Sequence, residues 1–569
     1  MKNNVEGHVG RAALALCAGL LVACSSKGDG PITDPVVEQT VQPPGANFSC
    51  PTSQVAELAV GDVRTALPGT FLCLKSSANA EYMLNGFFAS TVPTAQTQVS
   101  VTGFGITTVS SSASTSLTVP RAMTTLDGST PRESIELAFR NYERNVLAPR
   151  MAGARLAYRN RASFNAAPPA VGDLLQLNAS STGCESPRYR FGRVAAVTNR
   201  AIVVSDTGNP AGGFTDAEYA SIGATFDTLV DPLDRAAFGD PTDIDANGRV
   251  IIFYTRVVNE LTPAQSPGVV EGFFNPRDLF PRTATPTLQA CTGSNVAEMF
   301  YMVVADPGGT INGNVRTKSD VQRSTISVIA HEYQHLINSA RRIYVNNADD
   351  FEEVWLNEGL SHIAEELLFY HTSGLASRSN IDATTITASQ RRVDAFNLHQ
   401  VANFGRYNQF LARPELSSPY ANNDSLSNRG AIWSFLRYAA DRKAASDGTF
   451  WQALVNSRTV GIPNLNAVLG TDVMPWFRDW SISVYTDDRA PTAATWQQPS
   501  WHFRSIYPRL GITTFPLRLR PLTNASATAV TLSGGGSMYA TFGVSAGTTA
   551  GLSWTAGSPS AVFSIVRTR

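Results

Sequence analysis

The chain has 569 residues, of which 43% are hydrophobic and 16% are charged, and its formal net charge is −1. The length predicts about three or four domains with a large core, and the hydrophobic content excludes a disordered chain. The near-neutral charge offers no electrostatic signature for nucleic acid, so we expect no nucleic-acid partner.

The first 24 residues have the pattern of an export signal. Lys2 and Arg11 are positive, and residues 12–23 form a short apolar run. The run ends in Leu-Val-Ala followed by Cys24, which resembles the lipobox of bacterial lipoproteins. That resemblance implies a signal peptide over 1–24, lipidation of Cys24 and an anchor in the outer membrane or at the cell surface. The alternative is an ordinary signal peptide with an incidental cysteine.

Four cysteines would remain in the mature chain: Cys50, Cys73, Cys184 and Cys291. An even number in an oxidising compartment predicts two disulfides, for which three connectivities are possible. We favour Cys50–Cys73 and Cys184–Cys291, because each of these pairs stays within one predicted domain.

After residue 24 the composition and the predicted secondary structure change from one segment to the next. Residues 25–48 are rich in Pro and Gly, which predicts a tether. Residues 49–140 begin with alternating segments broken by turns, which predicts an N-terminal β-sandwich-like domain. Thr130, Pro131 and Glu133 then fit the first positions of a helix, which we expect to run to about residue 152 and to link two domains.

Residues 170–490 contain strand patterns followed by helical ones, and residues 500–569 return to strands. Strands followed by helices predict an α+β domain, and the terminal strands predict a second β-sandwich-like domain. The predicted fold class is therefore α+β and multidomain, with the central domain flanked by two β domains.

The central domain contains an HExxH motif formed by His331, Glu332 and His335. In a helix, positions i and i+4 share one face, so both imidazoles can reach one ion. Zinc accepts such nitrogen ligands and keeps a position for water, which Glu332 can reach. With only 7 histidines in the chain, a chance match is improbable. A pair of structural helix histidines is the alternative.

A third ligand must come from elsewhere. In the three-histidine class a glycine and a further histidine follow the motif, but Asn338 and Arg341 stand at those positions. The remaining option is a glutamate on a following helix. Residues 354–371 have a helical pattern and supply Glu358.

The segments around these residues resemble the gluzincins. Asn-Glu-Gly-Leu-Ser at 357–361 is similar to the corresponding segment of thermolysin-type enzymes, and both segments together resemble the hyicolysin family of bacterial metallopeptidases. The resemblance implies a zincin-like domain over 170–490, zinc held by His331, His335 and Glu358, and Glu332 as general base and acid. His362 departs from it, because relatives carry an aspartate there. We expect Glu365 or Glu366 to orient the first histidine instead.

The group that stabilises the oxyanion is not specified by these motifs. It is usually a tyrosine or a histidine, and Tyr407, Tyr420 and His399 lie downstream. We choose Tyr420 first. Aminopeptidase relatives place a tyrosine three residues before a Gly-Ala pair, but that position is Ser427 here.

A second, weaker motif begins at Asp243 and reads Asp-Ile-Asp-Ala-Asn-Gly, like the start of a calcium loop. The loop's last ligand should be a glutamate, but Tyr254 stands there, which excludes an EF-hand. A calcium site and a simple tight turn are both left open.

Together these features predict a zinc-dependent endopeptidase that acts on protein or peptide substrates at the bacterial cell surface. One alternative is a surface adhesion or binding lipoprotein with an inactive peptidase-like domain. The other is an aminopeptidase-type exopeptidase, although no GAMEN-like segment precedes His331.

Overall fold

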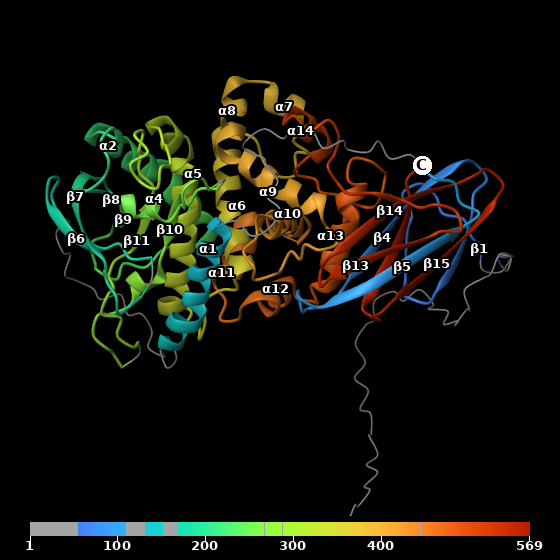
Figure 1. The fold of residues 1–569 in the computed structure, drawn as a ribbon, viewed down its shortest axis with the longest axis horizontal. Helices are drawn as coiled ribbons and strands as arrows, with labels where there is room; N and C mark the ends of the chain where they lie inside the picture. The colour runs from blue at the N-terminus through green and yellow to red at the C-terminus, as the bar shows by residue number, and fades with distance from the viewer. Residues whose placement is uncertain are drawn as a thin grey trace, which may run out of the picture. The chain divides into compact units, whose positions relative to one another are not determined.

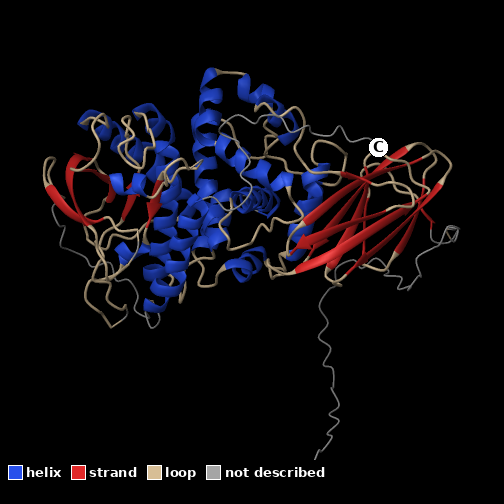
Figure 2. Ribbon diagram, in the orientation of Figure 1, coloured by secondary structure: helices blue, strands red, loops and turns tan. Residues whose placement is uncertain are grey.

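The computed structural model describes residues 50, 55–109, 131–151, 168–181, 183–266, 268–286, 288–443 and 446–569. All of them belong to one unit, 41–569. The predicted signal peptide, Cys24 and the predicted tether lie outside the described residues. Figure 1 shows the ribbon, and Figure 2 shows its strands gathered in two groups.

The central domain contains a six-stranded mixed sheet with strand order β10-β11-β9-β8-β7-β6. Strands β8, β9 and β11 are parallel, whereas β10 is antiparallel to β11 and lies at the end of the sheet. The apolar runs of β9 and β11 are buried at every position, as expected for strands covered on both faces. The strands are β6 (Leu174–Asn178), β7 (Tyr189–Val197), β8 (Ala201–Asp206), β9 (Val250–Tyr254), β10 (Gly272–Phe274) and β11 (Met299–Met302).

Helix α5 (Lys318–Ala340) packs on β10, β11 and helix α6 (Val354–Ser373). A capping box begins α5: the Thr317 hydroxyl accepts from the Asp320 N–H, and the Asp320 carboxylate accepts from the Thr317 N–H. Gly374, with φ 72°, ends α6 in the left-handed conformation that glycine adopts at low cost. These signals set the lengths of the two helices that carry the predicted metal ligands.

Helices α3 (Asp231–Phe238), α8 (Gln390–His399) and α10 (Leu426–Lys443) contact this pair. Helix α10 packs on α6 and α9. The α-helices are α1 (Pro131–Tyr142), α2 (Asp216–Thr225), α3 (Asp231–Phe238), α4 (Arg256–Glu260), α7 (Ala383–Thr387), α8 (Gln390–His399), α9 (Val401–Ala412), α10 (Leu426–Lys443), α11 (Asp447–Val455), α12 (Gly461–Leu469), α13 (Met474–Thr486) and α14 (Phe503–Arg509). Shorter helical segments are η3 (Glu143–Leu147), η4 (Ala148–Arg150), η5 (Phe226–Val230), η6 (Pro276–Leu279), η7 (Arg341–Val345) and η8 (Ala494–Trp496).

Both ends of the chain contribute to one β-sandwich. Its sheets have the orders β1-β3-β15-β5-β13 and β12-β14-β4-β16-β2. Strand β4 lies between β14 and β16, so that Leu84 is opposite both Ala540 and Ile565. The strands are β1 (Val55–Ala56), β2 (Val63–Ala66), β3 (Phe71–Lys75), β4 (Ala80–Phe88), β5 (Gln96–Phe104), β12 (Arg520–Pro521), β13 (Ala527–Ser533), β14 (Ser537–Val544), β15 (Thr549–Ala556) and β16 (Ala561–Arg567).

The expectation of two separate β domains at 49–140 and 500–569 is therefore wrong. The alternation of a strand specifies which side chains face a core, but it does not specify which strand lies beside it. Neither segment pairs only with itself, because strands from both ends alternate within both sheets. The central domain is thus inserted between the two halves of one sandwich.

The sandwich contacts the helices through the sheet that contains β4 and β14. The Tyr539 hydroxyl donates to the Ser481 carbonyl at 2.8 Å, and the Ser481 hydroxyl donates to the Asn85 side chain at 3.1 Å. Every residue of β14 is buried, which requires cover on both faces of this sheet. One face packs in the sandwich core and the other packs against α13.

The two disulfides are the pairs favoured from the sequence. Cys50 is bonded to Cys73 with an S–S distance of 1.94 Å, and Cys184 is bonded to Cys291 at 2.05 Å. The first lies in the sandwich and the second in the central domain. Helix α1 begins at the expected Pro131, while Thr130 lies outside the described residues.

Candidate metal centre

The motif histidines lie one turn apart on α5 and face the same space. The Nε2 atoms of His331 and His335 are 3.2 Å apart. His331 is 9% exposed and His335 is fully buried, while the apolar neighbours Ile329 and Leu336 pack in the core. The α5 helix therefore has an apolar face that anchors it and a polar face that carries two imidazoles.

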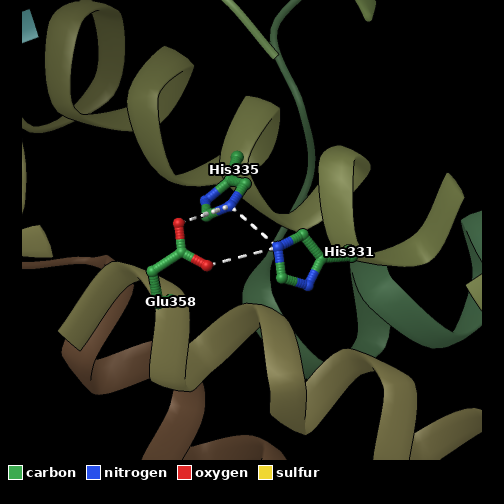
Figure 3. Close-up of side chains that lie close together, drawn as sticks. All are labelled: His331, His335 and Glu358. Atoms are coloured by element: carbon green, nitrogen blue, oxygen red, sulfur yellow. Dashed lines mark hydrogen bonds and ion pairs between the residues drawn. The ribbon is translucent and has the colours of Figure 1, made fainter. Parts of the chain in front are cut away.

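Glu358 comes from α6, which packs beside α5. Its Oε2 atom lies 3.4 Å from His331 Nε2, and its Oε1 atom lies 3.5 Å from His335 Nε2. Figure 3 shows the three side chains pointing at one another. The structure thus brings together the three residues predicted to bind the metal.

The spacing of these atoms fits a small metal ion. Zinc bonds of about 2.0–2.1 Å in tetrahedral geometry place neighbouring ligand atoms about 3.3 Å apart. The three observed separations are 3.2, 3.4 and 3.5 Å. Two imidazoles and one carboxylate also match the donor set of a catalytic zinc site. His331, His335 and Glu358 would therefore hold zinc, with a fourth position left for water or substrate.

The electrostatic surroundings set the protonation of these groups. Burial raises the pKa of Glu358, but Arg429 and Arg140 outweigh it and hold that pKa well below its usual range. Burial and then Arg140 hold the pKa of His335 well below its usual value. Burial lowers the pKa of His331, but its acidic neighbours outweigh burial and raise that pKa to about 9. Since a metal binds neutral imidazole, binding would release a proton from His331.

A carboxylate from the same helix as Glu358 orients the first histidine. Glu365 Oε1 lies 2.9 Å from His331 Nδ1 and 3.0 Å from His362 Nδ1. Arg406 Nη1 holds the other oxygen of Glu365 at 3.1 Å. Glu366 points elsewhere and accepts from the Trp501 indole N–H at 2.6 Å. Of the two carboxylates considered from the sequence, Glu365 is therefore the one that contacts His331.

Glu332 lies in the pocket beside the predicted metal ligands, and it is 6% exposed. Strand β10 comes close to it at Gly272. A Cβ atom on Gly272 would lie 2.7 Å from Val328 Cγ1 and 3.3 Å from Glu332 Cγ. The absence of a side chain at 272 thus lets the end strand of the sheet approach α5 and the motif glutamate.

The pocket is bounded by the end strand, by the ligand helices and by three arginines. Its lining residues are Phe139, Arg140, Val270, Glu271, Gly272, Phe273, Phe274, Val328, His331, Glu332, Glu358, Glu365, Arg406 and Arg429. The carboxylate of Glu358 is held between two of the arginines. Arg140 Nη2 lies 2.9 Å from its Oε1 atom, and Arg429 Nη1 lies 3.0 Å from its Oε2 atom.

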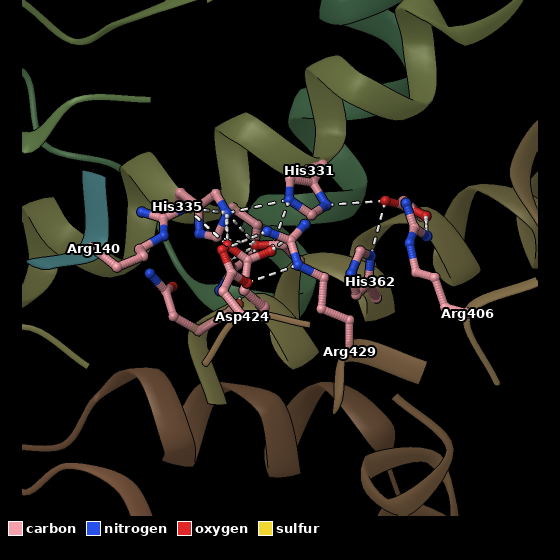
Figure 4. A network of polar contacts seen from close by, with 12 residues as sticks. Arg140, His331, His335, His362, Arg406, Asp424 and Arg429 are labelled. Atoms are coloured by element: carbon pink, nitrogen blue, oxygen red, sulfur yellow. Dashed lines mark hydrogen bonds and ion pairs between the residues drawn. The ribbon is translucent and has the colours of Figure 1, made fainter. Parts of the chain in front are cut away.

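Arg429 has a fixed orientation. Its Nε and Nη2 atoms donate to the two oxygens of Asp424 at 2.8 and 2.9 Å, as Figure 4 shows with the surrounding network. Gly430 lets α10 pack closely on α9, because a Cβ there would lie 2.3 Å from the backbone between Arg406 and Tyr407. Arg140, Arg406 and Arg429 were missed from the sequence, since none lies in the two metal-binding segments. The sequence feature that could have pointed to Arg429 as a site residue is its position directly before Gly430-Ala431.

The structure does not bring Tyr420 to this site. Its hydroxyl donates to the Ser90 carbonyl at 2.6 Å, and its ring packs against Trp355 and Phe477. It is 2% exposed and does not line the pocket. Its assignment as the oxyanion-stabilising group is therefore wrong. Tyr420 instead joins the helices to the β-sandwich.

The second motif forms a turn. Ligand atoms of Asp243, Asp245 and Glu298 lie within 4.8 Å of one another. The Gly248 N–H donates to Asp243, Asn247 donates to Asp245, and Glu298 accepts from the Thr242 hydroxyl and the Ile244 N–H. These bonds account for the acidic residues as caps of a tight turn, so calcium binding is unsupported.

Comparison with known proteins adds one relative. No family model matches the chain. Over 153 residues, the chain is 32% identical to the neutral metalloprotease ShpI of Staphylococcus hyicus. The match covers 27% of this chain and 31% of ShpI, so the chain spans less than a third of the length of this relative. The similarity supports a metalloprotease, in agreement with the buried site of His331, His335 and Glu358.

Proposed function

We propose that the protein is a zinc-dependent endopeptidase of the gluzincin, hyicolysin type. The observation that carries this proposal is the tetrahedral spacing of His331, His335 and Glu358 beside the carboxylate of Glu332. The similarity to a protein named a neutral metalloprotease supports the same reaction class. An adhesion protein with an inactive peptidase-like domain would not need all four of these groups.

The residues of the pocket supply the parts of amide hydrolysis. Bound zinc would activate a water molecule and polarise the scissile carbonyl. Glu332 takes the proton of the attacking water and returns it to the leaving amine. Arg429 lines the pocket, Asp424 fixes its guanidinium, and its Nη1 atom lies next to Glu358, one of the proposed metal ligands. From this position Arg429 would donate a hydrogen bond to the carbonyl oxygen as negative charge develops there.

Strand β10 provides a place for an extended substrate. Among the described strands it pairs only with β11, and Gly272, Phe273 and Phe274 line the pocket. An extended peptide can add to the end of a sheet through main-chain hydrogen bonds. Such pairing holds the substrate backbone on both sides of the scissile bond. This arrangement favours an endopeptidase over an aminopeptidase, which needs a group that captures a free amine.

We also propose that the chain is exported and held at the cell surface by lipid on Cys24. The supports are the charged start, the apolar run before Cys24 and the two disulfides. Among the described residues, no helix is long and apolar enough to span a membrane. Mass spectrometry of the N-terminal peptide from membrane fractions would test lipidation, and an unmodified Cys24 in that peptide would exclude it.

The direct test is metal analysis of the purified protein together with casein cleavage. We expect about one equivalent of zinc, internal cleavage of casein, loss of cleavage with a chelator and recovery when zinc is returned. Release of only N-terminal amino acids would indicate the aminopeptidase alternative. Stoichiometric zinc with no cleavage of any peptide would favour the binding-protein alternative.

A further inference from the structure

The last turn of α1 lies directly on the predicted metal ligands. Arg140 Nη2 is 2.9 Å from Glu358 Oε1 and 3.2 Å from His335 Nε2. Arg140 is 8% exposed, and its guanidinium forms part of the pocket wall. A cationic side chain from outside the two ligand helices thus contacts two of the three ligand atoms.

The residue before it covers the end strand of the sheet. The ring of Phe139 stacks on the ring of Phe273 in β10, with centroids 5.0 Å apart and an interplanar angle of 29°. Both Phe139 and Phe273 line the pocket. The α1 helix therefore lies over the strand along which a substrate backbone would pair.

Further contacts dock this segment at the rim of the site. Arg144 donates to both oxygens of Glu353, just before α6, at 2.6 and 3.0 Å, while Glu143 accepts from Arg140 Nη1 within the segment at 2.6 Å. The Cys184 N–H donates to the Tyr142 hydroxyl at 2.7 Å. The end of α1 is thus held by named polar partners as well as by the stacked ring.

We propose that residues 137–151 act as an intramolecular inhibitor, which must leave the cleft before a peptide substrate can bind. The inference rests on the proposed peptidase function. Arg140 contacts Glu358 Oε1 from the pocket side, where a scissile carbonyl has to approach, and its guanidinium forms part of the pocket wall. Phe139 covers the strand that would hold the substrate backbone. Displacement of the segment exposes both features together.

The first test compares Phe139→Ala and Arg140→Gln with the wild-type full-length protein and with Asn141→Ala, an exposed position on the same helix. All are loaded with one equivalent of zinc. We expect both cleft variants to lose zinc to a chromogenic chelator at least about tenfold faster and to show a similar gain in kcat/KM for a peptide substrate. Asn141→Ala should match wild type. Zinc loss in the cleft variants at or below the wild-type rate would overturn the inhibitor.

The second test needs no mutation and no catalysis. Hydrogen exchange of the amides of residues 137–147 is measured in the zinc-loaded wild-type protein, with and without a peptide hydroxamate. We expect faster exchange when the hydroxamate is bound, since it displaces the segment. Full occupancy by the hydroxamate with unchanged exchange would overturn the inhibitor while leaving the metal site intact. Absence of peptide hydrolysis in every variant, with faster zinc loss in the cleft variants, would instead overturn the peptidase function.

Discussion

Glu365 accepts a hydrogen bond from Nδ1 of His331 at 2.9 Å. This bond leaves Nε2 of the same ring directed at the other two predicted metal ligands, 3.2 Å from Nε2 of His335. A carboxylate on the far nitrogen of a ligand histidine fixes its tautomer and increases its basicity. On α6, His362 stands where the resemblance implied an aspartate, and Glu365, about one turn further along the same helix, supplies the carboxylate instead.

Replacing this carboxylate tests its role in positioning His331. Glu365→Gln should weaken zinc binding by about 10- to 100-fold, because the ring loses its anionic partner. Competition with a chelator of known affinity gives the dissociation constant. Asp394→Asn, at an exposed position on α8, is the matched control and should bind zinc like wild type. Equal zinc affinity in Glu365→Gln and wild type would show that the bond does not support the site.

The general base can be separated from the metal site. Glu332→Gln keeps the size of the side chain but cannot take a proton, so we expect kcat to fall by at least about 10²-fold while zinc stays at one equivalent. Glu358→Ala should lose zinc and activity together, since it removes a ligand. Full activity in Glu332→Gln would disprove the mechanism. Stoichiometric zinc in Glu358→Ala would place the third ligand elsewhere.

Arg429 replaces Tyr420 as the residue expected to face the developing oxyanion. Arg429→Gln should lower kcat by about 10²–10³-fold in saturating zinc, with a smaller change in KM. Arg429→Lys should recover only part of kcat, because lysine cannot make the two-pronged contact with Asp424. Arg458→Gln, an exposed substitution, controls for loss of charge. A normal kcat in Arg429→Gln would remove this residue from the mechanism.

Glu298, which lies just before β11 and accepts hydrogen bonds from Thr242 and Ile244, should make stability depend on pH. Burial raises the pKa of Glu298 from 4.5 to about 7, so the folded protein holds this proton at pH values where the unfolded chain has lost it. The contribution of Glu298 to the free energy of unfolding is therefore largest at low pH. It falls by about 3 kcal/mol as the pH rises from about 4.5 to 7. Urea unfolding at pH 5 and pH 8 should show this loss in wild type.

Glu298→Gln supplies the contrast, because it mimics the protonated carboxyl at every pH. Its free energy of unfolding should vary less between pH 5 and pH 8 than that of wild type, by about the same 3 kcal/mol. Glu185→Gln, at an exposed position, should leave the wild-type pH dependence unchanged. The same pH dependence in Glu298→Gln and wild type would assign the effect to other groups.

The sequence by itself determined the parts of the site that depend on local geometry. His331 and His335 share a face because a helix repeats every 3.6 residues, and Glu358 lies on the next long helix with its own apolar face. The start of α1 at Pro131 and the buried runs of β9 and β11 also follow from local preference. In each case the relevant neighbours lie within a few residues along the chain.

Tertiary structure alone decided which distant segments meet. Arg140 precedes Glu358 in the sequence and Arg429 follows it, yet both contact its carboxylate. Tyr420 lies away from the pocket, and its hydroxyl donates to the Ser90 carbonyl. Likewise, β4 lies between β14 and β16, although hundreds of residues separate β4 from these two strands in the sequence. Strand alternation and single arginines specify burial and charge, but not partners. Those partners are selected only when the whole core packs and each buried charge must find its counter-charge.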